Sequence, residues 1–380
     1  MKFIHLSDLH LGIRFKERSM LEDQRYILNE ILNVIDTEKP EGVIIAGDVY
    51  DKSVPSAEAV DLFDKFLSNL AERRLQVFVI SGNHDSPERI AFGSRIMGAQ
   101  GIHLSPVYSG TVDPVCLTDS FGAVNVYLLP FIKPADVRRF FPEEQIGSYT
   151  DALNCAVQSM QIDPAARNII ITHQFVTGAA RSDSEDSFSV GGTDNVDAAV
   201  FEAFDYVALG HLHTPQNCGS PKIRYCGTPL KYSFAEAKNQ KSVTVVELGK
   251  KGDLSVRTIP LKPLRDMVEI KGKYDDLMQK SFYENTTYQT DYVHIILTDE
   301  DDVPEGNAKL RVVYQNLLAL DYDNTRTRSV SRIEGAVGVE SKSPLQLFAE
   351  LYELQNNRPM SEEQTEFVKT LIEKVWEGKV

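Results

Sequence analysis

The sequence has few cysteines and no long apolar run. None of its four cysteines forms a CxxC pair, so neither a zinc ribbon nor a disulfide framework is predicted. No apolar stretch is long enough to cross a bilayer, and the opening MKFIHLSDLH turns polar before the apolar region of a signal peptide could form. We therefore expect a cytoplasmic protein with reduced cysteines and no membrane partner.

Positive charge is also scarce, because 40 Lys and Arg stand against 55 Asp and Glu. Such a balance normally argues against a nucleic-acid binder, since phosphate contacts depend on Lys and Arg. The acidity is concentrated late in the chain: residues 266–380 carry 22 acidic and 13 basic side chains, and residues 1–265 carry 33 and 27. If the first part binds a polyanion, it must use a local basic surface or bound cations.

Length and 42% apolar content allow two or three domains. In the first third, strands alternate with amphipathic helices, which predicts parallel strand pairing. The predicted strands lie at 2–6, 42–46 and 77–81, and the helices at 21–36 and 56–70. Later strands are predicted at 124–129, 168–172 and 206–209, followed by an antiparallel meander at 223–226, 242–248 and 254–259. We expect an α/β domain at 1–265 whose sheets are mixed or form two packed layers.

Two smaller parts follow. The pattern of apolar residues in 266–338 predicts a small α+β domain with strands at 267–270 and 292–297 and a helix at 310–318. Residues 339–380 predict a two-helix element, since capping boxes at 343–346 and 361–364 precede apolar runs. The apolar faces of these helices are wide, so they need either the chain's own core or another chain. The short polar linker at 340–343 favours a partner-binding element.

Polar side chains follow five of the predicted strands in the first domain. They are Asp8 and His10, Asp48, Asn83 with His84, His173, and His211 with His213. Any one of these clusters, taken alone, is what an ordinary turn or an ordinary polar residue would give. Together they predict one shared site, because ligands bind beyond the carboxyl ends of strands in α/β sheets.

The donors at these positions are imidazole, carboxylate and amide oxygen, with no thiolate. This set suits Mn²⁺, Fe²⁺, Zn²⁺ or Mg²⁺ and excludes a structural cysteine-type zinc site. There are too many donors for one ion. Two ions roughly 3.5–4 Å apart, sharing one carboxylate, would use all of them and would clamp the attacking and leaving oxygens of a phosphoryl centre.

The motifs DLH, GD, GNHD, TH and GHLH, in this order, resemble those of the calcineurin-like metallophosphoesterases. Within that superfamily the chain resembles the SbcD family through HLSDLHLG, AGDVYD, SGNHDS, THQF, VALGHLHTPQ and IRYCGTPLKYSFAE. The resemblance covers residues 1 to about 260 strongly. It implies a β-sandwich flanked by helices, a small α+β capping domain and a C-terminal two-helix element.

The resemblance also implies roles for the site residues. Asp8, His10 and His213 would hold one metal ion, Asn83, His173 and His211 the other, and Asp48 would bridge the two. His84 would stabilise the phosphate and protonate the leaving 3′ oxygen. Asp85 would orient His84 or simply cap the turn. Asp51 stands where archaeal and eukaryotic relatives place a second catalytic histidine.

A Mn²⁺-dependent DNA nuclease is the activity that the resemblance implies, with 3′ to 5′ exonuclease action on duplex ends and endonuclease action on single strands and hairpins. It further implies a homodimer and an SbcC-type ABC ATPase with a coiled coil as partner. Residues 266–338 would contact DNA, and residues 339–380 would grip the coiled coil. The candidates for phosphate contact are Arg14, Lys16, Arg18, Arg89 and Lys231.

Two other functions fit part of the sequence. A phosphatase or cyclic-nucleotide phosphodiesterase of the same superfamily would use the same metal site, but a small substrate requires neither the extra domain nor the helical tail. A non-catalytic interaction subunit with a relic site would not need the complete ligand set or His84. The nuclease interpretation therefore accounts for most of the chain.

Overall fold

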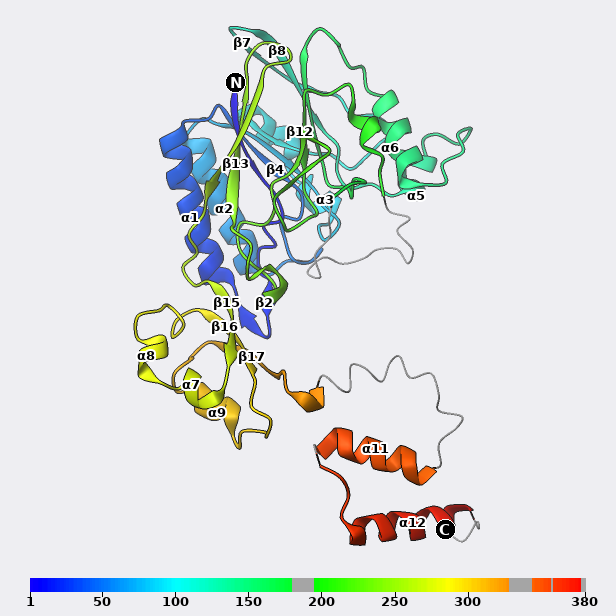
Figure 1. Cartoon of the computed structure of the whole chain (residues 1–380). Helices are drawn as coiled ribbons and strands as arrows, with labels where there is room; N and C mark the ends of the chain where they lie inside the picture. Colours follow the sequence, from blue (N-terminus) through cyan, green and yellow to red (C-terminus); the bar gives the residue numbers. More distant parts are fainter. Residues whose placement is uncertain (180–194, 328–343, 357, 377–380) are drawn as a thin grey trace. The chain divides into compact units, whose positions relative to one another are not determined.

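The computed structural model describes residues 1–179, 195–327, 344–356 and 358–376. It divides into two compact units, Met1–Asp266 and Met267–Val380 (Figure 1). The predicted boundary between residues 338 and 339, the linker at 340–343 and the first residue of the capping box at 343–346 lie outside the described residues. All four cysteines are free, as the sequence predicts. Across the described residues, no helix has the length and apolar character that a membrane crossing requires.

The first sheet of unit 1 has the strand order β14-β13-β1-β4-β5-β6. Its strands are β1 (Lys2–Leu6), β4 (Gly42–Ala46), β5 (Gln76–Ile80), β6 (Ile102–Leu104), β13 (Ser242–Leu248) and β14 (Leu254–Pro260). Strands β1, β4, β5 and β6 are parallel, and β13 is antiparallel to both neighbours. Helices α1 (Leu21–Glu38) and α2 (Ala57–Glu72) bury their apolar faces against one side of this sheet.

The second sheet has the order β11-β12-β10-β9-β8-β7. Its strands are β7 (Val115–Asp119), β8 (Gly122–Leu128), β9 (Arg167–Thr172), β10 (Tyr206–Leu209), β11 (Gln216–Cys218) and β12 (Ser220–Tyr225). Helix α6 (Tyr149–Gln158) packs on its outer side, with α5 (Pro134–Arg138) nearby. The short elements are β2 (Arg14–Phe15), β3 (Arg18–Ser19), α3 (Pro87–Ile90), α4 (Ser94–Met97), η1 (Gly98–Gln100), η2 (Ala198–Phe201) and η3 (Phe234–Glu236).

The two sheets pack face to face. Their shared core contains Phe3 and Phe78 from the first sheet and Val126, Ile169 and Tyr206 from the second, all fully buried. The unit is therefore a β-sandwich with helices on both outer faces, as predicted.

The predicted three-stranded meander is wrong in one strand. Strand β12 lies in the second sheet, parallel to β10, while only β13 and β14 form the expected antiparallel pair. The reason is that Ile223 and Tyr225 of β12 pack into the core on the outer side of the second sheet. The chain then crosses through η3 to the first sheet before β13 begins.

Unit 2 contains a three-stranded parallel sheet, β15-β16-β17. Its strands and helices are β15 (Met267–Gly272), α7 (Tyr274–Leu277), α8 (Lys280–Tyr283), β16 (Tyr292–Leu297), α9 (Gly306–Leu310) and β17 (Leu317–Tyr322). The predicted strands at 267–270 and 292–297 are confirmed. The helix predicted at 310–318 is wrong, because α9 ends at Leu310 and β17 begins at Leu317. The helical spacing of Leu310, Tyr314 and Leu317 misled the prediction: all three enter one core, but from a helix end, a turn and a strand.

Two helices close the described chain, α11 (Pro344–Asn356) and α12 (Glu362–Trp376), as the sequence predicts. The second capping box is confirmed, since the Gln364 N–H donates to Ser361 Oγ at 3.2 Å and the Ser361 N–H donates to Gln364 Oε1 at 2.9 Å. The two helices contact each other. Val368 of α12 is buried, whereas Phe367 and Leu371 are 69% and 46% exposed.

A buried arginine ties together two turns at one end of the sandwich, the β7–β8 turn and the β13–β14 turn. Arg167 is 2% exposed, and its guanidinium donates to Asp119 Oδ2 at 3.0 Å, to the Gly249 carbonyl at 2.9 Å and to the Gly122 carbonyl at 2.8 Å. Hydrogen bonding to Arg167 holds the pKa of Asp119 well below its usual range. The ion pair therefore stabilises the fold above the ordinary pKa of aspartate, and this contribution declines as the pH falls toward the lowered value.

We expect Asp119→Asn to reduce the free energy of unfolding by about 3 kcal/mol near neutral pH, because it leaves a buried guanidinium without its counter-charge. This value is at the low end of the range for breaking a buried ion pair, because the Asp119 side chain is 18% exposed and water weakens its attraction to Arg167. Urea unfolding of both proteins measures the difference, which should narrow at about pH 3, below the ordinary aspartate pKa. Equal stability near neutral pH would contradict the assigned role.

Candidate metal centre

The predicted polar clusters follow the C-terminal ends of β1, β4, β5, β9 and β10. Several of these residues have left-handed backbone conformations, with φ of 52° at Asp8, 43° at His10, 47° at Asp48 and 99° at His211. Residues other than glycine rarely adopt such conformations, and the surrounding structure must hold them there. The loops thus store backbone strain where their side chains converge.

Two glycines allow the loops to approach so closely. A Cβ atom at Gly82 would lie 2.1 Å from Asp48 Oδ1, and one at Gly210 would lie 2.0 Å from the Ala46 carbonyl oxygen. Both contacts are far shorter than atoms tolerate. The glycines of the GNHD and GHLH motifs are therefore required by the close packing of neighbouring strand ends.

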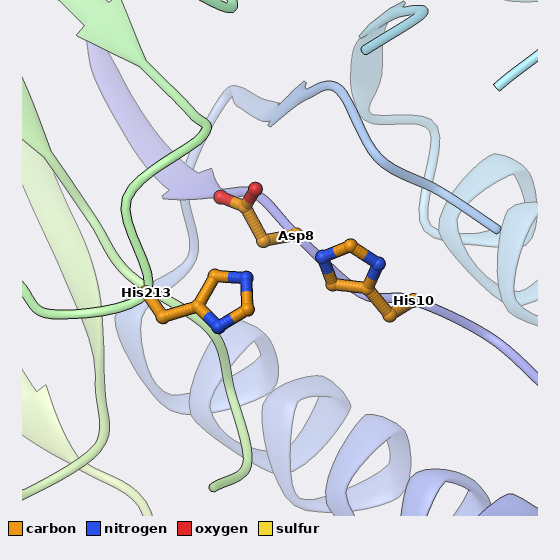
Figure 2. Close-up of side chains that lie close together, drawn as sticks. All are labelled: Asp8, His10 and His213. Carbon is orange, nitrogen blue, oxygen red and sulfur yellow. The ribbon is translucent and has the colours of Figure 1, made fainter. Parts of the chain in front are cut away.

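Asp8, His10 and His213 form one group of potential ligands (Figure 2). One donor atom from each lies within 4.8 Å of the others. Both ring nitrogens of His10 are buried and have no hydrogen-bond partner among the described residues. A buried polar atom that lacks a partner is costly, and a cation at this position would remove that cost. The donor set therefore fits a divalent metal ion.

Asn83, His173 and His211 form the second group. Asn83 Oδ1 lies 2.9 Å from His173 Nε2 and 3.0 Å from His211 Nδ1. The His173 Nδ1 atom lies 2.8 Å from the Ala46 carbonyl oxygen, so Nδ1 carries the proton. The lone pair of Nε2 is therefore left to face the site. This tautomer is the one that a metal ligand requires.

Asp48 lies between the two groups. Its Oδ2 atom is 3.2 Å from His173 Nε2 and 3.7 Å from His10 Nε2. Its Oδ1 atom accepts a hydrogen bond from the His84 N–H at 2.9 Å. The structure thus brings all seven predicted ligands together, with Asp48 in the position expected of a bridge.

The electrostatics of the site call for positive charge. Asp8 and Asp48 are 0% and 2% exposed, and burial raises the pKa of Asp8 to about 6. Burial lowers the pKa of His10 to about 3, so this imidazole is neutral and able to bind a metal ion. Burial also lowers the pKa of His173, but the Asp48 and Asp8 carboxylates outweigh it and raise that pKa to about 9. A bound cation would take the place of this proton.

His84 lies at the edge of the site with its side chain 27% exposed, and its Nε2 atom is 4.0 Å from Asp48 Oδ2. The predicted orienting contact from Asp85 is not what the described residues show. Instead, His84 Nδ1 donates to the Asp51 carbonyl oxygen at 3.0 Å. The Asp85 carboxylate accepts from the N–H groups of Gly82 and Val49 at 3.0 Å and of Tyr50 at 2.9 Å. Three convergent donors hold this short side chain inward, so Asp85 joins the loops after β4 and β5.

Sequence reasoning missed the residues behind the ligands. Glu236 is fully buried, and its Oε1 atom lies 3.3 Å from His213 Nδ1. Gln24 donates to the carbonyl oxygens of Leu9 at 3.1 Å and His10 at 2.8 Å. The acidic residue at the end of the SFAE stretch was a usable signal for Glu236, because it lies within a matched motif. Nothing local in the sequence indicated Gln24.

The predicted phosphate contacts divide into two kinds. Arg14, Lys16 and Arg18 are exposed on the β2–β3 hairpin, and Arg89 is exposed on α3. Lys231 is instead mostly buried and forms an ion pair with Asp266 at 2.8 Å. It is therefore the weakest candidate of the five.

Comparison with known proteins identifies the family. The family model described as calcineurin-like phosphoesterase matches residues 1–215, and the SbcD C-terminal model, described as a type 5 capsule protein repressor C-terminal domain, matches residues 263–356. A protein of Staphylococcus epidermidis that is named as the D subunit of the SbcCD nuclease is 32% identical over 378 residues, which cover 98% of each chain. This chain belongs to the SbcD family of calcineurin-like phosphoesterases.

Solved structures also resemble this SbcD-family chain, at low identity. A dimetal phosphatase from Danio rerio is 12% identical, covers 70% of this chain and 98% of its own, and has a TM-score of 0.42. A protein from Thermus thermophilus is 9% identical, covers 68% and 98%, and has a TM-score of 0.37. Family membership and the grouped ligands make the SbcD-family chain a metal-dependent phosphoesterase.

We expect Mn²⁺ to stabilise the protein against thermal unfolding, by about 2.7 kcal/mol for each site at a hundredfold excess over its dissociation constant. Asp48→Asn should remove most of this stabilisation, because Asp48 contacts both ligand groups. Asp61→Asn is the control, since Asp61 is exposed on α2 and pairs with Lys65 on the same helix. A wild-type response to Mn²⁺ in Asp48→Asn would refute the bridging position.

Proposed function

We propose that this chain is the nuclease subunit of an SbcC–SbcD-type complex and hydrolyses phosphodiester bonds in DNA with two divalent ions, Mn²⁺ being the preferred metal. One observation carries the proposal: Asp48 lies between the two groups of proposed ligands, and His84 faces the same carboxylate from the more exposed side. The relative from S. epidermidis is named a nuclease subunit, which supports DNA as the substrate over a small phosphate ester.

The metal ions, when bound, supply charge neutralisation and water activation. Asp8, His10 and His213 would hold one ion, Asn83, His173 and His211 would hold the other, and both would share Asp48. His84 would act on the phosphate directly. Its Nδ1–H donates to the Asp51 carbonyl, so Nε2 is the ring atom left for the substrate, and the doubly protonated ring would give its Nε2 proton to the leaving 3′ oxygen. The Asp51 carbonyl thereby orients the imidazole, which is one of the two roles that the sequence left open for Asp85.

Binding of a polyanion by this acidic chain requires local positive charge. The exposed Arg14, Lys16 and Arg18 on one hairpin and Arg89 beside the GNHD loop supply it. We propose 3′ to 5′ exonuclease action on duplex ends and endonuclease action on single strands and hairpins. Residues 266–338 are the further DNA-contact region.

Two protein partners are part of the proposal. A second copy of the chain binds through the surface around α3 and α4, where Phe92 and Ile96 are 83% and 79% exposed. An SbcC-type ABC ATPase binds through its coiled coil to α11 and α12, whose outward apolar residues include Phe367 and Leu371. A cytoplasmic location stays a prediction from the sequence.

Purified protein with Mn²⁺ should degrade a blunt duplex oligonucleotide, and His84→Ala should lower the rate by about 10²–10⁴-fold because it removes a general acid. Calorimetric Mn²⁺ titration should show unchanged binding in this variant. His103→Gln is the matched control, since His103 lies on β6 against Phe78 and Gln76. Turnover of cyclic nucleotides or phosphate monoesters without any action on DNA would favour the phosphatase alternative and reject the nuclease.

For the tail, Phe367→Asp should abolish co-purification with the ATPase partner while DNA cleavage by the isolated subunit continues. The reason is that a carboxylate in the centre of an apolar contact is costly to bury. Thr370→Asp adds the same charge at an exposed position of the same helix and should leave the complex intact. Equal loss in both variants, or in neither, argues against this surface as the ATPase contact.

A further inference from the structure

A buried ion pair lies behind one of the proposed metal ligands. The side chains of Glu236 and Lys241 are 0% and 5% exposed and form a salt bridge. Glu236 Oε1 lies 3.3 Å from His213 Nδ1, while the Lys241 ammonium donates to the His213 carbonyl oxygen at 2.9 Å and to Thr228 Oγ1 at 2.6 Å. The pair therefore contacts His213 at both its ring and its backbone.

Stability alone does not account for this pair. Removing two charges from water costs several kcal/mol per ion, and well-packed apolar residues in place of a buried ion pair are often equally or more stabilising. Lys241 lies beside the start of β13 and Glu236 at the end of η3. The contacts with His213 are the feature that apolar residues could not reproduce.

The two ligand groups are supported differently. In the second group, His173 donates its Nδ1–H to a backbone carbonyl, that of Ala46. In the first group, His213 donates its Nδ1–H to the carboxylate of Glu236. A carboxylate partner fixes the same tautomer but also makes the imidazole a stronger ligand than a carbonyl does.

We propose that Glu236 and Lys241 are positioning residues that hold His213 in its Nδ1–H tautomer and strengthen it as a ligand of the metal ion bound by Asp8, His10 and His213. Glu236 acts on the ring, and Lys241 fixes the Glu236 carboxylate and balances its charge. The inference rests on the proposed two-metal function.

The test is calorimetric titration of the full chain with Mn²⁺ alone. Glu236→Gln keeps the shape of the side chain but removes its charge, and it should weaken one of the two binding events by about 10–100-fold, the usual effect of losing a partner behind a metal ligand. The other binding event should be unchanged. Asp119→Asn breaks a buried ion pair away from the ligands, and it should bind both ions as the wild type does.

The outcomes separate this inference from the proposed function. The inference is overturned if Glu236→Gln binds both Mn²⁺ ions with the affinities of the wild type. It is also overturned if both affinities fall equally and the unfolding temperature falls with them, because the ion pair would then have a structural role only. Fewer than two Mn²⁺ ions bound by the wild type would instead reject the two-metal function.

A second measurement needs no variant. Nitrogen-15 NMR of the metal-free wild-type protein at mildly alkaline pH should show His213 as the Nδ1–H tautomer with a hydrogen-bonded proton. A dominant Nε2–H tautomer would overturn the inference even if Glu236→Gln failed to fold.

Discussion

The burial of two carboxylates, Asp8 and Asp48, where strand ends of two packed sheets meet is the constraint on which the site depends. Neither residue has more than 2% of its surface exposed. Two negative charges in such a position require positive charge close by. The two carboxylates belong to three overlapping clusters of possible ligand atoms, which are Asp8, His10 and His213; His10, Asp48 and His84; and Asp8, Asp48 and His173. Bound divalent cations would use these donors and would also supply the positive charge.

Backbone strain and close packing of the loops bring the side chains of the site together. Left-handed backbone at Asp8, His10 and Asp48 turns side chains from neighbouring strands toward one point. Gly82 and Gly210 let the loops approach within distances that any side chain would prevent. Asp85 then ties the loop after β4 to the loop after β5 through three backbone N–H groups. The β-sandwich supplies a rigid base, and these local features determine how its strand ends converge.

The sequence predicted those parts that depend on neighbouring residues. An apolar run followed by a polar turn identifies a strand end, so the sequence located β1, β4, β5, β9 and β10 and the polar side chains that follow them. Features that depend on distant partners were not found. The placement of β12 depends on which core receives Ile223 and Tyr225. Two of the three partners of Asp85, Val49 and Tyr50, come from a different strand end. The contact of Lys241 with His213 likewise exists only in the folded chain. The false helix at 310–318 has the same origin, since helical spacing cannot reveal that Leu310 and Leu317 reach one core from different elements.

The central claim is that one pocket of seven side chains holds two metal ions that share Asp48. Crystals of the full chain grown with Mn²⁺, measured with anomalous scattering at the manganese edge, test it most directly. The account predicts two anomalous peaks roughly 3.5–4 Å apart, one beside Asp8, His10 and His213, the other beside Asn83, His173 and His211, with Asp48 between them. A single peak, or peaks away from these side chains, would contradict it.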